Sequence, residues 1–141
     1  MAMLDDNIRN ELERRFKGIE HPVRIINFTQ TMECQFCEQT RQLLEELAST
    51  SDKVTLDVFN FQTDKEVAQK YSIDKIPATV IEGQKDYGIR FYGIPSGYEF
   101  GNLIDAVERV GAGDSGLDEH TRERLGTLTE PVHLQVFVTP T

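Results

Sequence analysis

The 141-residue sequence contains no tryptophan, only two cysteines and no apolar run of about 18 residues. Because a membrane-spanning helix needs about 20 predominantly apolar residues, the chain is not expected to cross a bilayer. Basic residues are also scarce, with 15 Lys and Arg against 24 Asp and Glu and a net charge of −9. Nucleic acids and anionic membrane surfaces attract basic faces, so neither is an expected partner.

The first 15 residues are charged and contain no apolar stretch typical of a secretory signal. We therefore expect a cytoplasmic protein. In a reducing compartment, a single pair of cysteines is more often catalytic or metal-binding than structural. The chemistry of this chain is accordingly expected at its two cysteines.

Those cysteines form the motif Cys34-Gln35-Phe36-Cys37, at the point where an apolar run changes to a helical pattern. Two intervening residues span one helical turn, which brings both sulfurs close enough to bond. A helix N-terminus also stabilises a thiolate, and the thiolate is the reacting species. The spacing therefore predicts a thiol–disulfide redox site.

Hydrophobic periodicity predicts an α/β fold. The expected helices cover residues 5–16, 35–51, 64–71, 98–111 and 118–125, and the expected strands cover residues 23–28, 54–61, 78–81, 89–92 and 132–138. A strand–helix–strand unit requires a parallel pair, whereas a strand–turn–strand unit requires an antiparallel one. We expect a mixed central sheet flanked by helices on both faces, with an extra N-terminal helix.

This order of elements around a C-x-x-C pair resembles the thioredoxin fold. A second signature is Lys75-Ile76-Pro77-Ala78-Thr79, just before the third strand. The resemblance implies a cis bond between Ile76 and Pro77 beside the disulfide, and cis bonds are largely confined to X–Pro. It also implies that an extended substrate peptide pairs with the backbone at Ile76, and that Pro77 blocks metal access to the thiols.

The segment from Arg90 to Phe100, together with the leading helix, resembles the N-terminal unit of the glutaredoxin-like protein disulfide oxidoreductases. Those proteins contain two tandem thioredoxin folds. The resemblance implies a thiol–disulfide oxidoreductase that acts on protein disulfides or dithiols, takes electrons from a reductase or thiol reductant, and needs no cofactor or metal.

An internal repeat agrees with a two-unit architecture. Residues 22–29 align with residues 131–138, with proline, valine and phenylalanine at the same places. We expect residues 1–128 to form one thioredoxin-fold unit, and residues 129–141 to be a linker and the first strand of a second, truncated unit. The alternative is a strand that completes the sheet of the first unit. An orphaned apolar strand would expose an edge, so we expect it to pack on this unit or to form a homodimer.

The resemblance assigns Cys34 as the nucleophile and Cys37 as the resolving cysteine. Phe36 is expected at the surface near the site, where it would contact substrate, although it could pack inward. Thioredoxin has a buried aspartate behind the second cysteine, and here Asn27 or Phe28 stands there. Asp57 on the second strand is a candidate proton acceptor in its place.

Two glutamates flank the cysteine pair. Glu33 replaces the tryptophan that precedes the first cysteine in thioredoxin, and Glu38 follows the second. Negative charges oppose thiolate formation, whereas the helix N-terminus favours it by about 0.3–1 kcal/mol. We therefore expect a modest thiolate bias and a moderately reducing or intermediate couple.

Other functions stay open at the level of sequence. The cysteines could be half of a zinc site, although a structural zinc needs four ligands and the three histidines are scattered. They could also be inert core residues. The domain could be a redox-inactive module for peptide binding, or could deliver electrons to a peroxidase, as the N-terminal domains of peroxiredoxin reductases do.

Overall fold

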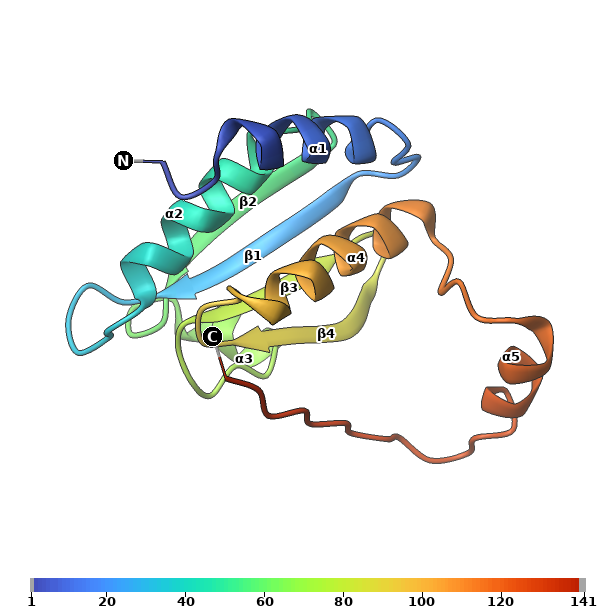
Figure 1. Ribbon diagram of the computed structural model, residues 1–141. Coiled ribbons are helices and arrows are strands. Elements are labelled where there is room, and N and C mark those ends of the chain that lie inside the picture. Colours follow the sequence, from blue (N-terminus) through green and yellow to red (C-terminus); the bar gives the residue numbers. More distant parts are fainter. Residues whose placement is uncertain (1, 140–141) are drawn as a thin grey trace.

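The computed structural model describes residues 2–139 and contains a central sheet with helices on both faces (Figure 1). The helices are α1 (Asp6–Phe16), α2 (Cys37–Ala48), α3 (Lys65–Lys70), α4 (Tyr98–Ala112) and α5 (Glu119–Leu125), and the strands are β1 (Val23–Thr29), β2 (Val54–Asn60), β3 (Ala78–Glu82) and β4 (Asp86–Tyr92). The predicted α/β architecture and the extra N-terminal helix are confirmed.

The four strands of the sheet lie in the order β2-β1-β3-β4. Strands β1 and β2 are parallel, because α2 connects them as a crossover. Strand β3 runs antiparallel to β1, and β4 runs antiparallel to β3. The mixed sheet follows from these connections, and β4 forms one of its edges.

Each face of the sheet has its own apolar core. On one face, α1, α2 and α4 pack against alternate residues of the strands, including Val23, Ile25 and Ile81. On the other face, α3 and the turn after it cover Ile26, Phe28 and Val80. This alternation is what a strand buried on both sides requires, and it decides which side chains can reach the cysteines.

Helix α1 is capped by Asp5, whose carboxylate accepts a 2.8 Å hydrogen bond from the backbone N–H of Ile8. Leu4, Leu12 and Phe16 are buried as the spacing predicts, but Ile8 is 38% exposed. The predicted apolar stripe is therefore wrong at Ile8, although its neighbours in the stripe, Leu4 and Leu12, are buried.

Helix α2 begins at Cys37, two residues later than expected, and ends at Ala48. Its chain leaves the carboxyl end of β1 through a short loop, so α2 runs back along the sheet with its first turn near the end of β1 (Figure 1). At the other end of α2, Glu46 accepts hydrogen bonds of 2.8 Å from the N–H groups of Met3 and Leu4. Partial burial opposes ionisation of Glu46, but these bonds outweigh it and lower its pKa.

The segment after α4 differs from the prediction. Helix α5 forms, with Asp118 as its N-cap, but buries none of its residues. The strand predicted at residues 132–138 is wrong: the described part of that segment is extended but pairs with no other strand. The chain runs back toward β4 and the start of α4 (Figure 1). Its apolar side chains are largely exposed to solvent. The proposed division at residue 128 remains a prediction, and its residues 1, 140 and 141 lie outside the described residues.

Candidate active site

The two cysteines form a disulfide, with their Cα atoms 5.5 Å apart. Cys34 lies in the loop before α2 and is partly exposed, whereas Cys37 opens the helix and is only 1% exposed. One sulfur is therefore open to an incoming partner and the other lies behind it. This asymmetry is what sequential thiol–disulfide exchange requires.

The start of α2 leaves its first backbone N–H groups available. Phe36 occupies the N-cap position and contributes no side-chain hydrogen bond, while its carbonyl accepts 3.0 Å and 2.7 Å bonds from the N–H and hydroxyl of Thr40. The N–H groups of the first turn have no partner within a helix. Their partial positive charge lies at the redox loop, where it favours a thiolate.

Glu33 enters the loop in an unusual backbone conformation. Its φ of 56° lies in the left-handed region, which non-glycine residues rarely adopt. Glu33 and Glu38 are both exposed on either side of the disulfide. Their charges are therefore screened by water, which limits how strongly they oppose ionisation of Cys34.

The Ile76–Pro77 peptide bond is cis, as the resemblance implied. Ala78 pairs with Phe28 across β1 and β3, which places Pro77 at the same end of the sheet as the loop that carries Cys34. Pro77 is buried and its carbonyl accepts a 2.9 Å hydrogen bond from Gly93, whereas Ile76 is partly exposed. The fold thus brings the two sequence signatures, 40 residues apart, to one end of the sheet.

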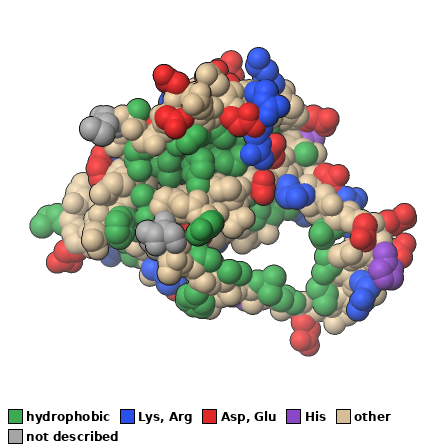
Figure 2. Space-filling view, in the orientation of Figure 1, with side chains coloured by type: hydrophobic (Ala, Val, Ile, Leu, Met, Phe, Trp, Pro, Cys, Tyr) green, Lys and Arg blue, Asp and Glu red, His purple; other side chains and the backbone are tan. Residues whose placement is uncertain are grey.

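A groove extends from the redox loop along the free edge of the sheet. Phe36, Lys75, Tyr92 and Ile94 line one side of it, and residues 132–138 line the other. Figure 2 shows apolar side chains along this C-terminal segment and an opening between it and the body of the molecule. Phe36 is 39% exposed, so the residue between the cysteines presents an aromatic surface to the groove.

The cationic side chains near the groove are already paired with carboxylates. Lys75 lies 2.6 Å from Asp74 and 4.6 Å from the ring centre of Tyr92. Arg90 donates bonds of 2.8 Å and 2.6 Å to Asp86. Arg41 on α2 lies between Glu38 and Glu45, at 3.4 Å and 3.5 Å. These pairs leave little positive field for an anionic ligand.

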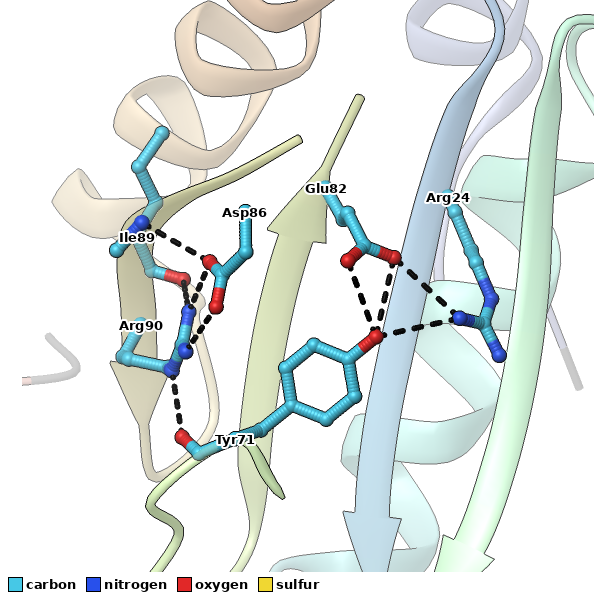
Figure 3. A network of polar contacts seen from close by, with 7 residues as sticks. Arg24, Tyr71, Glu82, Asp86, Ile89 and Arg90 are labelled. Atoms are coloured by element: carbon cyan, nitrogen blue, oxygen red, sulfur yellow. Dashed lines mark hydrogen bonds and ion pairs between the residues drawn. The ribbon is translucent and has the colours of Figure 1, made fainter. Parts of the chain in front are cut away.

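Asp57 does not come together with the cysteines. It is in register with Ile26, so it lies on the face of the sheet that α3 covers, whereas Cys37 lies on the opposite face. Its carboxylate pairs with Arg24, which also contacts Glu82 and Tyr71 (Figure 3). Burial, and then hydrogen bonding to Glu82, raise the pKa of Tyr71. Asp57 thus borders a structural polar network.

The residue on β1 that does face α2 is Asn27. It is fully buried, and its side-chain amide donates a 3.1 Å bond to the carbonyl of Ala78, the residue after Pro77. Its neighbour across the sheet is Thr79, also fully buried. The sequence placed Asn27 or Phe28 here without choosing between them, and did not indicate Thr79. Alternation along β3 could have found it, because Thr79 and Ile81 share a face.

Within residues 2–139, no group of three His, Cys, Asp or Glu side chains is arranged to hold a metal ion. Over the same residues, no helix is long and apolar enough to cross a membrane.

The fold and the site together are those of a thioredoxin-like domain with a C-x-x-C disulfide. The chain belongs to the thioredoxin domain family, whose model matches residues 23–105. The F subunit of alkyl hydroperoxide reductase from Pseudomonas aeruginosa is 30% identical over 125 residues, which are 87% of this chain. The chain spans about a fifth of that relative, 21% of its length.

Two solved structures are similar over most of the chain. A protein disulfide oxidoreductase from Aeropyrum pernix K1 superposes with a TM-score of 0.87 at 26% identity, over 99% of this chain and 62% of the other. A domain of the alkylhydroperoxide reductase AhpF from Enterococcus faecalis superposes with a TM-score of 0.78 at 27% identity, over 86% of this chain and 59% of the other.

Proposed function

We propose that the chain exchanges disulfides with protein substrates, with Cys34 as the nucleophile and Cys37 as the resolving cysteine. The observation that carries this assignment is the difference in burial between the two bonded sulfurs: Cys34 is partly exposed and Cys37 is 1% exposed. Of the two bonded sulfurs, the one on the partly exposed Cys34 is therefore the one open to a sulfur of another protein.

Reduction of a substrate proceeds in two balanced steps. The Cys34 thiolate attacks one sulfur of the substrate disulfide, and the other substrate sulfur leaves with the electron pair and takes a proton from solvent. Cys37 then loses its proton and attacks Cys34, which releases the second substrate sulfur and closes the Cys34–Cys37 bond. Two electrons have passed from the protein to the substrate, and a reductase or thiol reductant must restore them.

The groove favours an extended polypeptide as substrate. Lys75 lines the groove, and the partly exposed Ile76 follows it in the chain. Pro77 has no N–H to donate, and Phe36 offers an apolar contact in the groove. Glutathione carries two carboxylates, and the cations around the groove are paired with Asp74, Asp86 and the acids of α2. We therefore favour protein substrates over glutathione, the substrate of glutaredoxins. We also propose that the protein works in the cytoplasm, where a single cysteine pair is typically redox-active.

A second candidate function is electron delivery to a peroxidase. The similarity to the F subunit of alkyl hydroperoxide reductase favours it. The same disulfide chemistry serves both functions, because only the identity of the partner disulfide differs.

The C-terminal segment is the proposed contact with a further thioredoxin-like unit. Leu134, Val136 and Phe137 are 86%, 84% and 90% exposed, and the neighbouring β4 is a sheet edge. Exposed apolar segments beside an open edge are typical of an interface. We propose that residues 132–138 pair with a second unit, either of a longer chain or of a second copy in a homodimer.

The proposed function is tested by insulin reduction with dithiothreitol as electron donor. Cys34→Ser is expected to abolish the activity above background, and Cys37→Ser is expected to accumulate a mixed disulfide detectable by mass spectrometry. Ser51→Ala, far from the site, serves as the control. Activity that survives Cys34→Ser would refute the mechanism and leave the redox-inactive module. Coupling to a peroxidase and its hydroperoxide substrate tests the second candidate.

A further inference from the structure

Two buried oxygen atoms near the redox site have no hydrogen-bond partner in the protein. They are the Oδ1 atom of Asn27 and the Oγ1 atom of Thr79, both from residues that are 0% exposed. The amide nitrogen of Asn27 is already used by the carbonyl of Ala78, so only its oxygen is left over. A buried oxygen without a partner costs about 1–3 kcal/mol, which native proteins usually avoid.

The two oxygen atoms belong to neighbouring side chains on the same face of the sheet. Asn27 and Thr79 are paired directly across the antiparallel β1 and β3, where opposite Cβ atoms lie about 4.5–5.5 Å apart. Ile25 and Ile81 are paired two residues earlier in β1, and both lie in the core that α2 covers. By alternation, Asn27 and Thr79 face the same helix.

The first turn of α2 lies over this pair. Cys37, Thr40, Leu44 and Leu47 form the buried face of the helix, and α2 runs antiparallel to β1 from the end of that strand. Leu47 is thus level with the start of β1 and Cys37 with its end, where Asn27 lies. The hydroxyl of Thr40 is already donated to the carbonyl of Phe36, so it does not satisfy either oxygen.

We propose that Asn27 and Thr79 bind one internal water molecule beneath Cys37, and that this uncharged site supports the resolving thiolate. Buried waters typically make about three hydrogen bonds to otherwise unpaired polar groups. Here the water accepts from the Thr79 hydroxyl and donates one hydrogen to Asn27 Oδ1. Its second hydrogen is left for the sulfur of Cys37 when the disulfide is open.

The inference rests on the proposed function. It gives Asn27 and Thr79 a positioning role in the second step of disulfide exchange, the attack of Cys37 on the mixed disulfide. Cys37 loses its proton to solvent and then attacks Cys34 of the mixed disulfide. Where little of Cys37 is ionised, a donor to its thiolate raises the ionised fraction by more than it lowers the nucleophilicity, so the step is faster. The inner faces of β1, β3 and α4 present only uncharged groups, such as Ile25, Ile81 and Leu103. The charged groups of the surrounding loops and helix starts, Glu33, Glu38, Lys75 and Glu99, are all at least partly exposed.

The kinetic test uses the reduced full chain and an aromatic disulfide, 5,5′-dithiobis(2-nitrobenzoate). Attack by Cys34 releases the first nitrothiobenzoate, and attack by Cys37 releases the second, which is followed from pH 5 to 9. Thr79→Val removes the hydroxyl at nearly constant volume. It is expected to slow the second release about three- to tenfold at neutral pH and to move its pH midpoint upward, while the first release stays unchanged.

Two further variants separate this role from a general structural one. Thr79→Ser keeps the hydroxyl and is expected to restore the second release. Thr50→Val removes another buried hydroxyl, just beyond the far end of α2, where it bonds to the carbonyl of Leu47, and is expected to leave both releases within twofold of the parent. An unchanged second release in Thr79→Val, or an equal loss in Thr50→Val, would overturn the inference.

The water itself is detected independently of activity. Magnetisation transfer from water to the side-chain amide protons of Asn27, measured by NMR, is expected in the parent and absent in Thr79→Val. Absence of that transfer in the parent would overturn the site. A parent that shows the transfer but no first release would refute the proposed oxidoreductase chemistry instead, so the two failures are distinguishable.

Discussion

The backbone N–H of Gly93 donates a 2.9 Å hydrogen bond to the carbonyl oxygen of Pro77. This bond joins the chain that leaves β4 to the residue that enters β3, at the end of the sheet where the redox loop lies. Gly93 makes the bond with a φ of 83°, which L residues rarely adopt. The position of Pro77 therefore depends on a glycine 16 residues later.

Gly93→Ala is expected to lower the free energy of unfolding by about 1–2 kcal/mol, because alanine is strained in the left-handed region. An added Cβ would meet no atom within 4 Å, so the loss would report backbone strain alone. Gly101→Ala is the matched control: it is also uncrowded, but lies in α4 and is expected to stabilise by about 0.5–1 kcal/mol. Urea unfolding measures both, and a change of the same sign and size in the two variants would refute the strain argument.

Neutralising Glu33 is expected to make Cys34 more reactive. Glu33 immediately precedes Cys34, so Glu33→Gln removes a negative charge that opposes the thiolate. The exposed position of Glu33 limits the gain to roughly a threefold faster alkylation by iodoacetamide at neutral pH. Glu66→Gln removes an exposed acid on α3, on the opposite face, and should leave the rate unchanged. A slower rate in Glu33→Gln would contradict the electrostatic argument.

Truncating Phe36 is expected to weaken substrate binding more than it slows the chemical step. Its ring lines the groove and is 39% exposed, so a peptide could cover about half of it and gain about 1 kcal/mol. Phe36→Ala should raise KM for a protein disulfide about fivefold while kcat changes less. Met32→Ala, at a 72% exposed loop residue outside the groove lining, is the control. An unchanged KM in Phe36→Ala would exclude this ring from the binding surface.

The Asp86–Arg90 pair predicts an acid-sensitive contribution to stability. Hydrogen bonds from Arg90 lower the pKa of Asp86, against a smaller effect of burial. A carboxyl whose pKa is lower in the folded state stabilises above its unfolded pKa, near 3.9, and that contribution disappears as the pH falls through the folded pKa. Asp86→Asn should lower the unfolding free energy at pH 7 by about 1–2 kcal/mol and flatten its decline between pH 4.5 and 2.

The control for that experiment is Asp52→Asn, at an exposed turn residue. It should change neither the stability at pH 7 nor its slope in acid. Thermal or denaturant unfolding followed by circular dichroism at several pH values provides the measurement. If Asp86→Asn retains the full acid slope, another carboxylate is responsible for it.

The C-terminal segment predicts concentration-dependent self-association. Phe137 is 90% exposed beside the edge strand β4, so pairing of two chains would bury it. Sedimentation velocity should show dimers of the parent at high concentration and fewer in Phe137→Asp. Gln135→Glu adds a charge to the same segment without removing an apolar side chain, so it should lower the dimer fraction less than Phe137→Asp does. A parent that stays monomeric throughout would leave a second unit of a longer chain as the proposed partner.

The sequence predicted the fold well wherever the local hydrophobic pattern agrees with the tertiary packing of the element. The β-branched residues of β1 and the spacing of Leu43, Leu44 and Leu47 in α2 gave elements of the correct type and order. The strand at residues 132–138 failed because a strand needs a partner, and the pattern of one segment cannot supply it. Ile8 keeps the spacing of the stripe and is still 38% exposed, because periodicity does not show how deeply each turn of a helix is covered.

The positions of the two cysteines and the proline could be predicted from the sequence, and those of the residues behind them less well. A motif fixes Cys34, Cys37 and Pro77 because the chemistry requires those residue types. The face to which Asp57 or Asn27 points depends on strand register, which only the assembled sheet defines. Asp57 consequently looked available from the sequence, although Arg24 holds it on the other face.

Phe36 stands between the two bonded cysteines, with its ring partly in solvent, in a chain that has no tryptophan. An indole introduced there would be the sole fluorophore of its kind and would lie next to a disulfide, a bond that quenches indole emission. Phe36→Trp would thus give the protein an optical reporter of its own redox state, brightening when the bond opens and dimming when it closes.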